Sequence, residues 1–379
     1  MTPSSRRVKS QPDVRVALVC PRFAPDIGGI EEHVAQLGRR LAAAGADVQV
    51  LTQSGPGPAP EETLAGMRVR RFRLPLPAHP DLPAPGLVAA LGRLDDVDVV
   101  HAHSYHALPA LAASMTAGRT PLVLTPHFHG AGHTRLRNAL HLAYRPLGRR
   151  LVARADAVVA VSPSEAALLD ARFGAGARTT VIPNGVSDVP LGQPYRRSRT
   201  TILACARLEP YKQVDVLIAA LALLPDRMEL VVVGDGPVRP DLEVLAARLG
   251  VADRVVFAGH VSDAELARWR GTASVFASAS SHESFGLTVA EALAAGIPTV
   301  ASDIAAHRDV VTMAGAGPRA QLVPAEPATV AAAVGAALDR PRPAAGACGL
   351  LGWDEVAERT LALYGSVLAR APGLAGARP

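Results

Sequence analysis

Glu283 and Glu291 are separated by seven residues, and the segment between them contains Phe285, Gly286 and the expected start of a helix. A glycine lets the backbone approach a ligand closely, and the free N–H groups of a first helical turn bind anions. Carboxylates placed before that turn and inside it can accept hydrogen bonds from hydroxyl groups on either side of a bound phosphate. Hydroxyl-rich groups that flank a diphosphate describe a nucleotide-sugar.

Two glutamates at this spacing are also typical of a capped surface helix. Here Phe285-Gly286 lies inside the spacing, and the stretch Ala295-Gly296-Ile297-Pro298 follows it. Taken together, these residues favour a nucleotide-sugar site over a simple cap.

Arg207 and Lys212 are the cations expected to bind the same diphosphate. Arg207 follows the apolar run 201–206, which predicts a strand, and Lys212 lies at the start of the next predicted helix. At a strand end that faces a cleft, two cations can hold a diphosphate and neutralise the charge that develops as it leaves. A solvated loop with two surface cations is the alternative. The expected position of the pair opposite the two glutamates favours the binding role.

Histidines cluster at two predicted strand ends in the first half of the chain: His101, His103, His106, His127, His129 and His133. Zinc is one interpretation, but His-x-His on a strand places both rings on one face, and no cysteine or His-Glu-x-x-His helix accompanies them. The sequence therefore favours a polar acceptor pocket lined by His103, His129 and His133, and it predicts no metal site. His127 is expected to point into the cleft, and His101 could be a hydrogen-bonded core residue.

Gly28 and Gly29 follow the first predicted strand and open a helix. Paired glycines allow a tight turn and a close backbone approach to a ligand. The Gly-x-Gly-x-x-Gly fingerprint of dinucleotide-binding folds is absent. A plain strand-to-helix turn remains as good an interpretation as a ligand contact.

The size and composition indicate two cores made of small aliphatic side chains. The chain has 379 residues, of which 49% are hydrophobic and only 4% aromatic. That length suggests two domains, and a core of Ala, Val and Leu is expected where helices flank parallel sheets. The net charge of +5 is modest. With few aromatic residues for base stacking and no nucleic-acid motif, it fits an anionic small substrate or a membrane edge better than nucleic acid.

Localisation is expected to be cytoplasmic, with contact to the inner face of the membrane left open. The N-terminus lacks the apolar core of a signal peptide, and the longest apolar run, 216–224, is too short to span a bilayer. Three widely spaced cysteines, Cys20, Cys205 and Cys348, suit neither a disulfide framework nor a zinc site. The Ala/Arg/Gly/Pro-rich composition fits a GC-rich bacterial genome.

Strand and helix patterns alternate along the whole chain, which predicts an α/β protein with parallel sheets. The predicted strands cover 14–20, 48–52, 97–103, 122–125, 157–162, 180–182, 201–206, 230–234, 254–258, 274–277 and 299–302. The polar, basic stretch 193–199 suits a linker. We expect residues 1–192 to form an acceptor-binding Rossmann-like domain and residues 200–352 to form a nucleotide-sugar-binding one. The final helix and tail, 353–379, should pack back on the first domain.

Three further segments are given structural roles. Asp96-Val97-Asp98 matches an Asp-x-Asp metal site for sugar nucleotides, but it lies at the entrance of a strand and is rejected. Residues 135–154 are basic and partly apolar, which favours packing with a basic rim over membrane binding, and Pro146 is expected to kink or split any helix there. Gly234-Asp235-Gly236-Pro237 is expected to form a tight strand-exit turn that lies near the ligand.

With these features in order, the chain resembles the retaining GT-B glycosyltransferases of family four from about residue 14 to residue 369. The resemblance rests on GGIEEHV, TPH, VSPSE, PNGV, ARLEPYKQVDVLI, GDGP, FAGHVSDAEL and ESFGLTVAEALAAGIPTVAS. It implies two Rossmann-like domains that face each other across a cleft. It also implies transfer of a sugar from a nucleotide diphosphate to an acceptor with retention at the anomeric carbon, no cofactor and no required metal.

The resemblance also implies a role for each matching residue. Arg207 and Lys212 would hold the diphosphate, Glu283 the sugar hydroxyls and Glu291 the ribose, with His127 beside the reacting centre. The remaining donor contacts would come from Phe285, Gly286, Leu287, Gly28, Gly29 and the loop that contains Val261.

The sequence departs from the family pattern in two places. Where many members carry a Gly-Gly or Gly-x-Pro-Glu turn, this chain has Ala305-Ala306-His307-Arg308-Asp309. Members that glycosylate phosphorylated inositol place a lysine soon after the Thr-x-His histidine, and residues 128–133 contain none. A phosphorylated acceptor of that kind is therefore not supported, and the acceptor stays open among lipid, polysaccharide and small-molecule hydroxyls. A GT-B sugar phosphorylase, a nucleotide-sugar epimerase and a noncatalytic sugar-binding protein are the alternatives.

Overall fold

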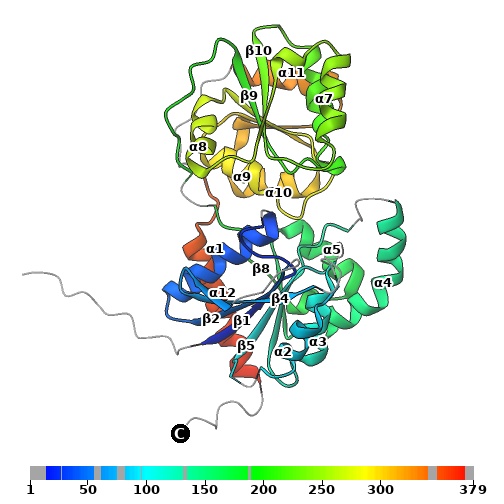
Figure 1. Cartoon of the computed structure of the whole chain (residues 1–379), viewed down its shortest axis with the longest axis vertical. Helices are drawn as coiled ribbons and strands as arrows, with labels where there is room; N and C mark the ends of the chain where they lie inside the picture. The colour runs from blue at the N-terminus through cyan, green and yellow to red at the C-terminus, as the bar shows by residue number, and fades with distance from the viewer. Residues whose placement is uncertain are drawn as a thin grey trace, which may run out of the picture. The chain divides into compact units, whose positions relative to one another are not determined.

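The computed structural model describes residues 14–26, 28–54, 61–74, 82–94, 96–130, 135–186, 189–339 and 348–371. The chain forms two compact units, each built on a mainly parallel β-sheet with helices against it (Figure 1). The first unit is Met1–Pro126, Pro146–Val159 and Ala357–Pro379, and the second is His127–Arg145 and Ala160–Val356. None of the helices described is long and apolar enough to cross a membrane.

The first sheet has eight strands in the order β3-β4-β2-β1-β5-β6-β7-β8. Its strands are β1 Arg15–Val19, β2 Asp47–Ser54, β3 Glu61–Leu64, β4 Met67–Arg73, β5 Val99–His103, β6 Leu122–Thr125, β7 Ala157–Ala160 and β8 Thr179–Val181. The helices of this part of the chain are α1 Gly29–Ala43, α2 Pro85–Leu91, α3 Leu108–Thr116, α4 Arg135–Arg154, α5 Pro163–Phe173 and, at the end of the chain, α12 Trp353–Arg370.

The second sheet has six strands in the order β11-β10-β9-β12-β13-β14, all paired in parallel. They are β9 Thr200–Cys205, β10 Met228–Val233, β11 Val255–Gly259, β12 Val275–Ser278, β13 Thr299–Ser302 and β14 Ala320–Val323. The helices are α6 Val214–Ala222, α7 Arg239–Arg248, α8 Asp263–Thr272, α9 Leu287–Ala294, α10 Ala305–Met313 and α11 Pro327–Leu338, with a 3-10 turn η2 at Pro210–Lys212.

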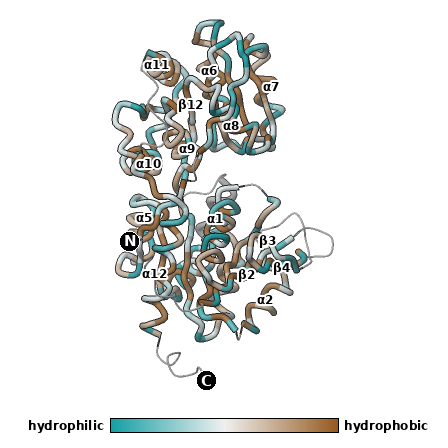
Figure 2. Tube along the Cα trace, turned by 90° about the vertical axis from the view of Figure 1, so that its left-hand side faces the viewer, coloured by the Kyte–Doolittle hydropathy of each residue, from teal (hydrophilic) through white to brown (hydrophobic). Residues whose placement is uncertain are grey.

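The strands of the second sheet are hydrophobic on both faces. On β9, Ile202 and Ala204 belong to one buried cluster, while Leu203 between them belongs to another. Because neighbouring side chains on a strand point to opposite faces, helices must cover both sides of this sheet. Figure 2 shows the resulting concentration of hydrophobic residues along β12 and α9.

The predicted α/β fold with two Rossmann-like halves is confirmed. Strands β6 and β13 begin and end where the sequence predicts, and the other predicted strands differ only at their ends. The antiparallel hairpin of β3 and β4 was missed, and so was β14. All four residues of β3 are exposed, so they show none of the apolar alternation by which strands are predicted.

The prediction that Pro146 would kink or split a helix at residues 135–154 is corrected in one part. Helix α4 runs unbroken through Pro146, so the proline does not split it. Proline removes only one backbone hydrogen bond, and a helix can absorb that loss by a local bend.

Candidate active site

Arg207 lies on a loop that two glycines allow to sit against the turn after β10. Gly234 has φ of 119°, and a Cβ added to it would lie 2.1 Å from the carbonyl oxygen of Ala206. A Cβ on Gly236 would lie 2.4 Å from the carbonyl oxygen of Leu208. Any side chain at these two positions would displace the backbone on either side of Arg207. The guanidinium itself is partly exposed and lies 3.6 Å from Glu209.

Lys212 and Glu283 form an ion pair in which Nζ lies 2.5 Å from Oε1, and both side chains are largely buried. The N–H of Ser281 donates to the carbonyl of Tyr211 over 2.8 Å, which ties the same two loops together. Burial opposes both charges, but the attraction of Glu283 outweighs it and raises the pKa of Lys212. Burial likewise opposes ionisation of Glu283, and the charge of Lys212 lowers its pKa overall. Both groups therefore stay charged at neutral pH.

Helix α9 begins at Leu287, shortly after Glu283, and offers an anion site. Gly286 is its N-cap with φ of 96°, a left-handed conformation that favours glycine, and no side chain caps the helix. The first turn contains no acidic residue. Its leading N–H groups have no acceptor within the helix, as at every helix start, and the helix dipole favours a negative charge there.

Glu291 lies in the second turn of α9 rather than in the first, because the helix begins at Leu287. Its carboxylate is 2.7 Å from Arg270 and is partly exposed. The expected ribose contact would therefore share this carboxylate with a cation.

Three aromatic rings contact one another beside Glu283. Tyr211 stacks on His282 with ring centroids 4.6 Å apart, and His129 is tilted against His282 with ring centroids 4.8 Å apart. His129, expected in the acceptor pocket, is therefore next to the Glu283 loop. His133, the third residue of that pocket, lies outside the described residues.

Glu165 is a functional candidate that the residue-by-residue reasoning missed. It is buried, and its two oxygens accept hydrogen bonds from the N–H of Phe128 over 2.5 Å and of Val161 over 2.7 Å. His127, next to Phe128, has a φ of 49°, a backbone conformation that residues other than glycine rarely adopt. Glu165 thus helps to fix the loop that presents His127. The Ser-x-x-Glu spacing of Ser162 and Glu165 was the available signal.

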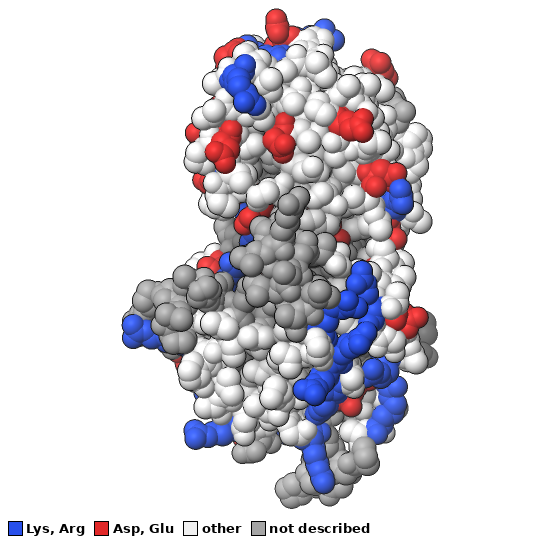
Figure 3. Space-filling view, turned by 90° about the vertical axis from the view of Figure 1, so that its right-hand side faces the viewer, with Lys and Arg blue, Asp and Glu red and all other residues white. Residues whose placement is uncertain are grey.

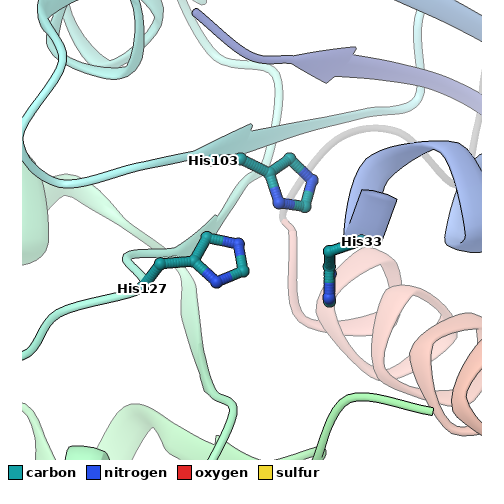
Figure 4. Close-up of side chains that lie close together, drawn as sticks. All are labelled: His33, His103 and His127. Atoms are coloured by element: carbon teal, nitrogen blue, oxygen red, sulfur yellow. The ribbon is translucent and has the colours of Figure 1, made fainter. Parts of the chain in front are cut away.

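His33, His103 and His127 lie close together, and all three are buried (Figure 4). They come from α1, from the end of β5 and from the segment after β6, and each offers a ring nitrogen within 4.8 Å of the others. Three imidazoles of this kind could hold a transition metal. His33 was not singled out in the sequence, although it is part of GGIEEHV.

His101 is the hydrogen-bonded core residue that the sequence suggested. Its Nδ1 lies 2.7 Å from the hydroxyl of Tyr364 on α12, and its Nε2 lies 2.7 Å from the hydroxyl of Thr125. Burial lowers the pKa of His101 to about 3, so the ring stays neutral. Asp98 is likewise structural, because it pairs with Arg15 over 3.1 Å at the start of β1.

The remaining residues expected to contact the donor lie at the start of α1, after β11 and before α9. Gly28 is extended, and a Cβ there would lie 2.2 Å from a carboxylate oxygen of Glu31, so a side chain at this position would displace that carboxylate. Gly29 begins α1, Val261 follows β11, and Phe285 is buried among apolar residues of the second unit.

Two family descriptions match the chain. Residues 27–188 match Glycosyltransferase Family 4, and residues 194–344 match Glycosyl transferases group 1. The chain is 34% identical to a D-inositol 3-phosphate glycosyltransferase of Xylanimonas cellulosilytica, over 94% of this chain and 98% of that protein. It is 31% identical to a phosphatidyl-myo-inositol mannosyltransferase of Mycolicibacterium smegmatis, over 83% and 82% of the two chains.

Solved structures of the same fold include sucrose-phosphate synthase from Thermosynechococcus elongatus, with a TM-score of 0.81 and 24% identity over 94% of this chain and 99% of that one. Anabaena HepE in complex with UDP and glucose has a TM-score of 0.75 and 20% identity over 93% and 99% of the two chains. The lipopolysaccharide glycosyltransferase WaaG shares the architecture with a TM-score of 0.64, 18% identity and coverage of 94% and 100%.

Titration of Glu165 should make stability depend on pH. Burial raises the pKa of Glu165 to about 8, although the two backbone N–H groups favour the ionised form. The folded protein then binds this proton more tightly than the unfolded chain, whose carboxyl has the ordinary value of 4.5. The contribution of Glu165 to stability is complete below pH 4.5 and is lost as the pH rises toward about 8.

Urea denaturation at stepped pH checks this for wild type and Glu165→Gln. The difference in free energy of unfolding between the two should shrink as the pH rises through this window. A difference that grows with pH would mean that Glu165 is ionised in the fold. Glu165→Ala removes both acceptors and should be less stable than wild type by about 1–3 kcal/mol for each N–H left without a partner.

Proposed function

Because the chain belongs to the glycosyltransferases that join a Glycosyltransferase Family 4 domain to a Glycosyl transferases group 1 domain, we propose that it is a retaining, metal-independent member. It would move a sugar from a nucleoside diphosphate to a hydroxyl group of an acceptor. The observation that carries this proposal is the ion pair of Lys212 with Glu283 directly before the uncapped start of α9.

The leaving diphosphate would be bound by Lys212, Arg207 and the first-turn N–H groups of α9. Arg207 lies near enough for its charge to lower the pKa of Lys212, so the two cations form one positive region. Two cations and a helix N-terminus, held in place before reaction, can meet the charge that develops on the diphosphate. This is the support for transfer without a metal.

Glu283 would bind hydroxyl groups of the donor sugar, and Glu291 the ribose. The remaining contacts are proposed as the resemblance assigns them: His127 beside the reacting carbon, and Phe285, Gly286, Leu287, Gly28, Gly29 and Val261 around the donor.

We propose that configuration is retained because the diphosphate leaves and the acceptor attacks on the same face of the sugar. The bond from the anomeric carbon to the diphosphate oxygen breaks, the bond to the acceptor oxygen forms on the same face, and the acceptor proton passes to the leaving diphosphate. Glu283 is paired with Lys212 and is therefore poorly placed to act as a nucleophile. A glycosyl adduct on Glu283, sought by mass spectrometry of the protein with donor alone, would contradict this route.

UDP is the proposed donor nucleotide, with GDP as the next candidate. The preference rests on how often family members use each base, and HepE has been solved with UDP. The relatives named above act on inositol compounds. The described residues after His127 are Phe-His-Gly at 128–130 and contain no lysine, which does not support a phosphorylated inositol as the acceptor of this chain.

A lipid acceptor would bring the enzyme to a membrane surface, and we include peripheral contact in the proposal. Figure 3 shows Lys and Arg side chains gathered on one face of the molecule. Arg149 and Arg150 on α4 are exposed. Basic surfaces of this kind bind anionic lipid headgroups in a salt-dependent way. Sedimentation with anionic vesicles at low salt, lost at high salt, would support contact, and no sedimentation at low salt would exclude it.

Calorimetric binding of UDP, GDP, ADP and dTDP in the presence of EDTA tests the proposed donor site. One nucleotide should bind, and Arg207→Ala/Lys212→Ala should weaken it at least about 100-fold, because two charge-assisted contacts are lost. The matched control Arg227→Ala/Arg248→Ala removes the same charge from exposed positions of the second unit and should bind as wild type does.

Failure of all four nucleotides to bind a folded protein both with and without EDTA would contradict the donor site. Binding that occurs only without EDTA would contradict metal independence. The phosphorylase alternative is tested separately, because only a phosphorylase would consume donor with phosphate as the sole acceptor.

A further inference from the structure

His307 lies in the segment where the sequence departs from the family pattern, and the proposed function has no role for it. It is on α10 and is completely buried. A buried imidazole is costly unless its nitrogens are hydrogen-bonded, so its surroundings are informative.

One ring nitrogen of His307 is fixed. Nδ1 lies 2.9 Å from the carbonyl oxygen of Ser302 and 3.2 Å from its hydroxyl. The Ser302 hydroxyl donates to the carbonyl of Ser280 over 2.5 Å, so its oxygen is free to accept. A carbonyl oxygen can only accept, and Nδ1 must therefore carry the hydrogen. Burial lowers the pKa of His307, and the negative charge of Glu283, which acts to raise it, does not outweigh burial. The ring therefore stays neutral.

The other nitrogen, Nε2, is consequently a bare acceptor, and it has no hydrogen-bond partner among the residues that the structure describes. The edge of the ring that carries Nε2 faces Gly286. A Cβ added to Gly286 would lie 2.9 Å from Cδ2 and 3.3 Å from Nε2. The N-cap of α9 thus rests directly on this edge of His307.

His307 and Glu283 also lie close enough for each to favour the charged form of the other, although burial keeps the His307 ring neutral. The Nδ1–H of His307 donates to the carbonyl of Ser302, and the Ser302 hydroxyl donates to the carbonyl of Ser280 on the loop that leads to Glu283. One side chain therefore connects β13, the 280–283 loop and the start of α9.

We propose that His307 is a positioning residue for the donor sugar, acting through Gly286 and Glu283. This rests on the proposed function, in which Glu283 binds sugar hydroxyls. In the proposed function the nucleoside diphosphate has Arg207 and Lys212 on another loop in addition to the start of α9, whereas the sugar hydroxyls depend on Glu283. His307 should therefore matter for the part of the affinity that the sugar adds, and little for the nucleotide itself.

Two isosteric substitutions separate the two ring nitrogens. His307→Asn keeps a donor near the place of Nδ1 and leaves the place of Nε2 empty. His307→Gln puts an amide near the place of Nε2 and gives up the bond to Ser302. Arg308→Gln is the matched control, because Arg308 is the next residue on α10, is exposed and pairs only with Asp303 among the described contacts.

The measurement is calorimetric affinity for the nucleoside diphosphate that binds best and for its glucose, galactose, mannose and N-acetylglucosamine esters. In His307→Asn the extra affinity for the preferred sugar ester over the bare nucleotide should fall about tenfold, with nucleotide affinity within about threefold of wild type. His307→Gln should keep more of the sugar-dependent affinity than His307→Asn, and Arg308→Gln should keep all of it.

Equal preference for the sugar ester in wild type and both variants would overturn the positioning role. So would a parallel loss of nucleotide and sugar-ester affinity, which is what a merely structural role predicts. Wild type that binds none of the nucleotides contradicts the proposed function instead, so the two failures are distinguishable.

Discussion

The ion pair between Lys212 and Glu283 is the interaction on which the rest of the candidate site depends. It joins the loop after β9 to the loop before α9, and a backbone hydrogen bond from Ser281 to Tyr211 reinforces the junction. Both charges are largely removed from water, so each would be costly without the other. Within the pair, Lys212 can still donate to phosphate oxygens and Glu283 can still accept from hydroxyl groups, so the pair suits a ligand that combines the two.

The surroundings of this pair are built from close backbone contacts more than from side chains. Gly234 and Gly236 let the turn after β10 lie against residues 206–208, and Gly286 lets α9 begin on the edge of His307. A Cβ at any of these three positions would be too close to the neighbouring loop or ring. The glycines therefore set the distance between the loops, and the loops in turn set where Arg207 and Glu283 lie.

Much of this arrangement could be predicted from the sequence because its signals are local. The apolar run of β6, the core role of His101 and the strand-entrance position of Asp98 follow from residue types and periodicity. The hairpin of β3 gives no such signal, because its side chains are all exposed. Glu165 and His307 were missed for another reason: their partners, Phe128 and Gly286, are far away in the sequence, and only the fold brings them together.

A crystal structure of the protein with its preferred nucleoside diphosphate, grown with EDTA present, would test the central claim most directly. We expect the phosphate oxygens within hydrogen-bonding distance of the Arg207 guanidinium, Lys212 Nζ and the first N–H groups of α9, with no metal ion between them. A diphosphate that contacts none of these groups, or that reaches the protein through a metal held by His33, His103 and His127, would contradict the account.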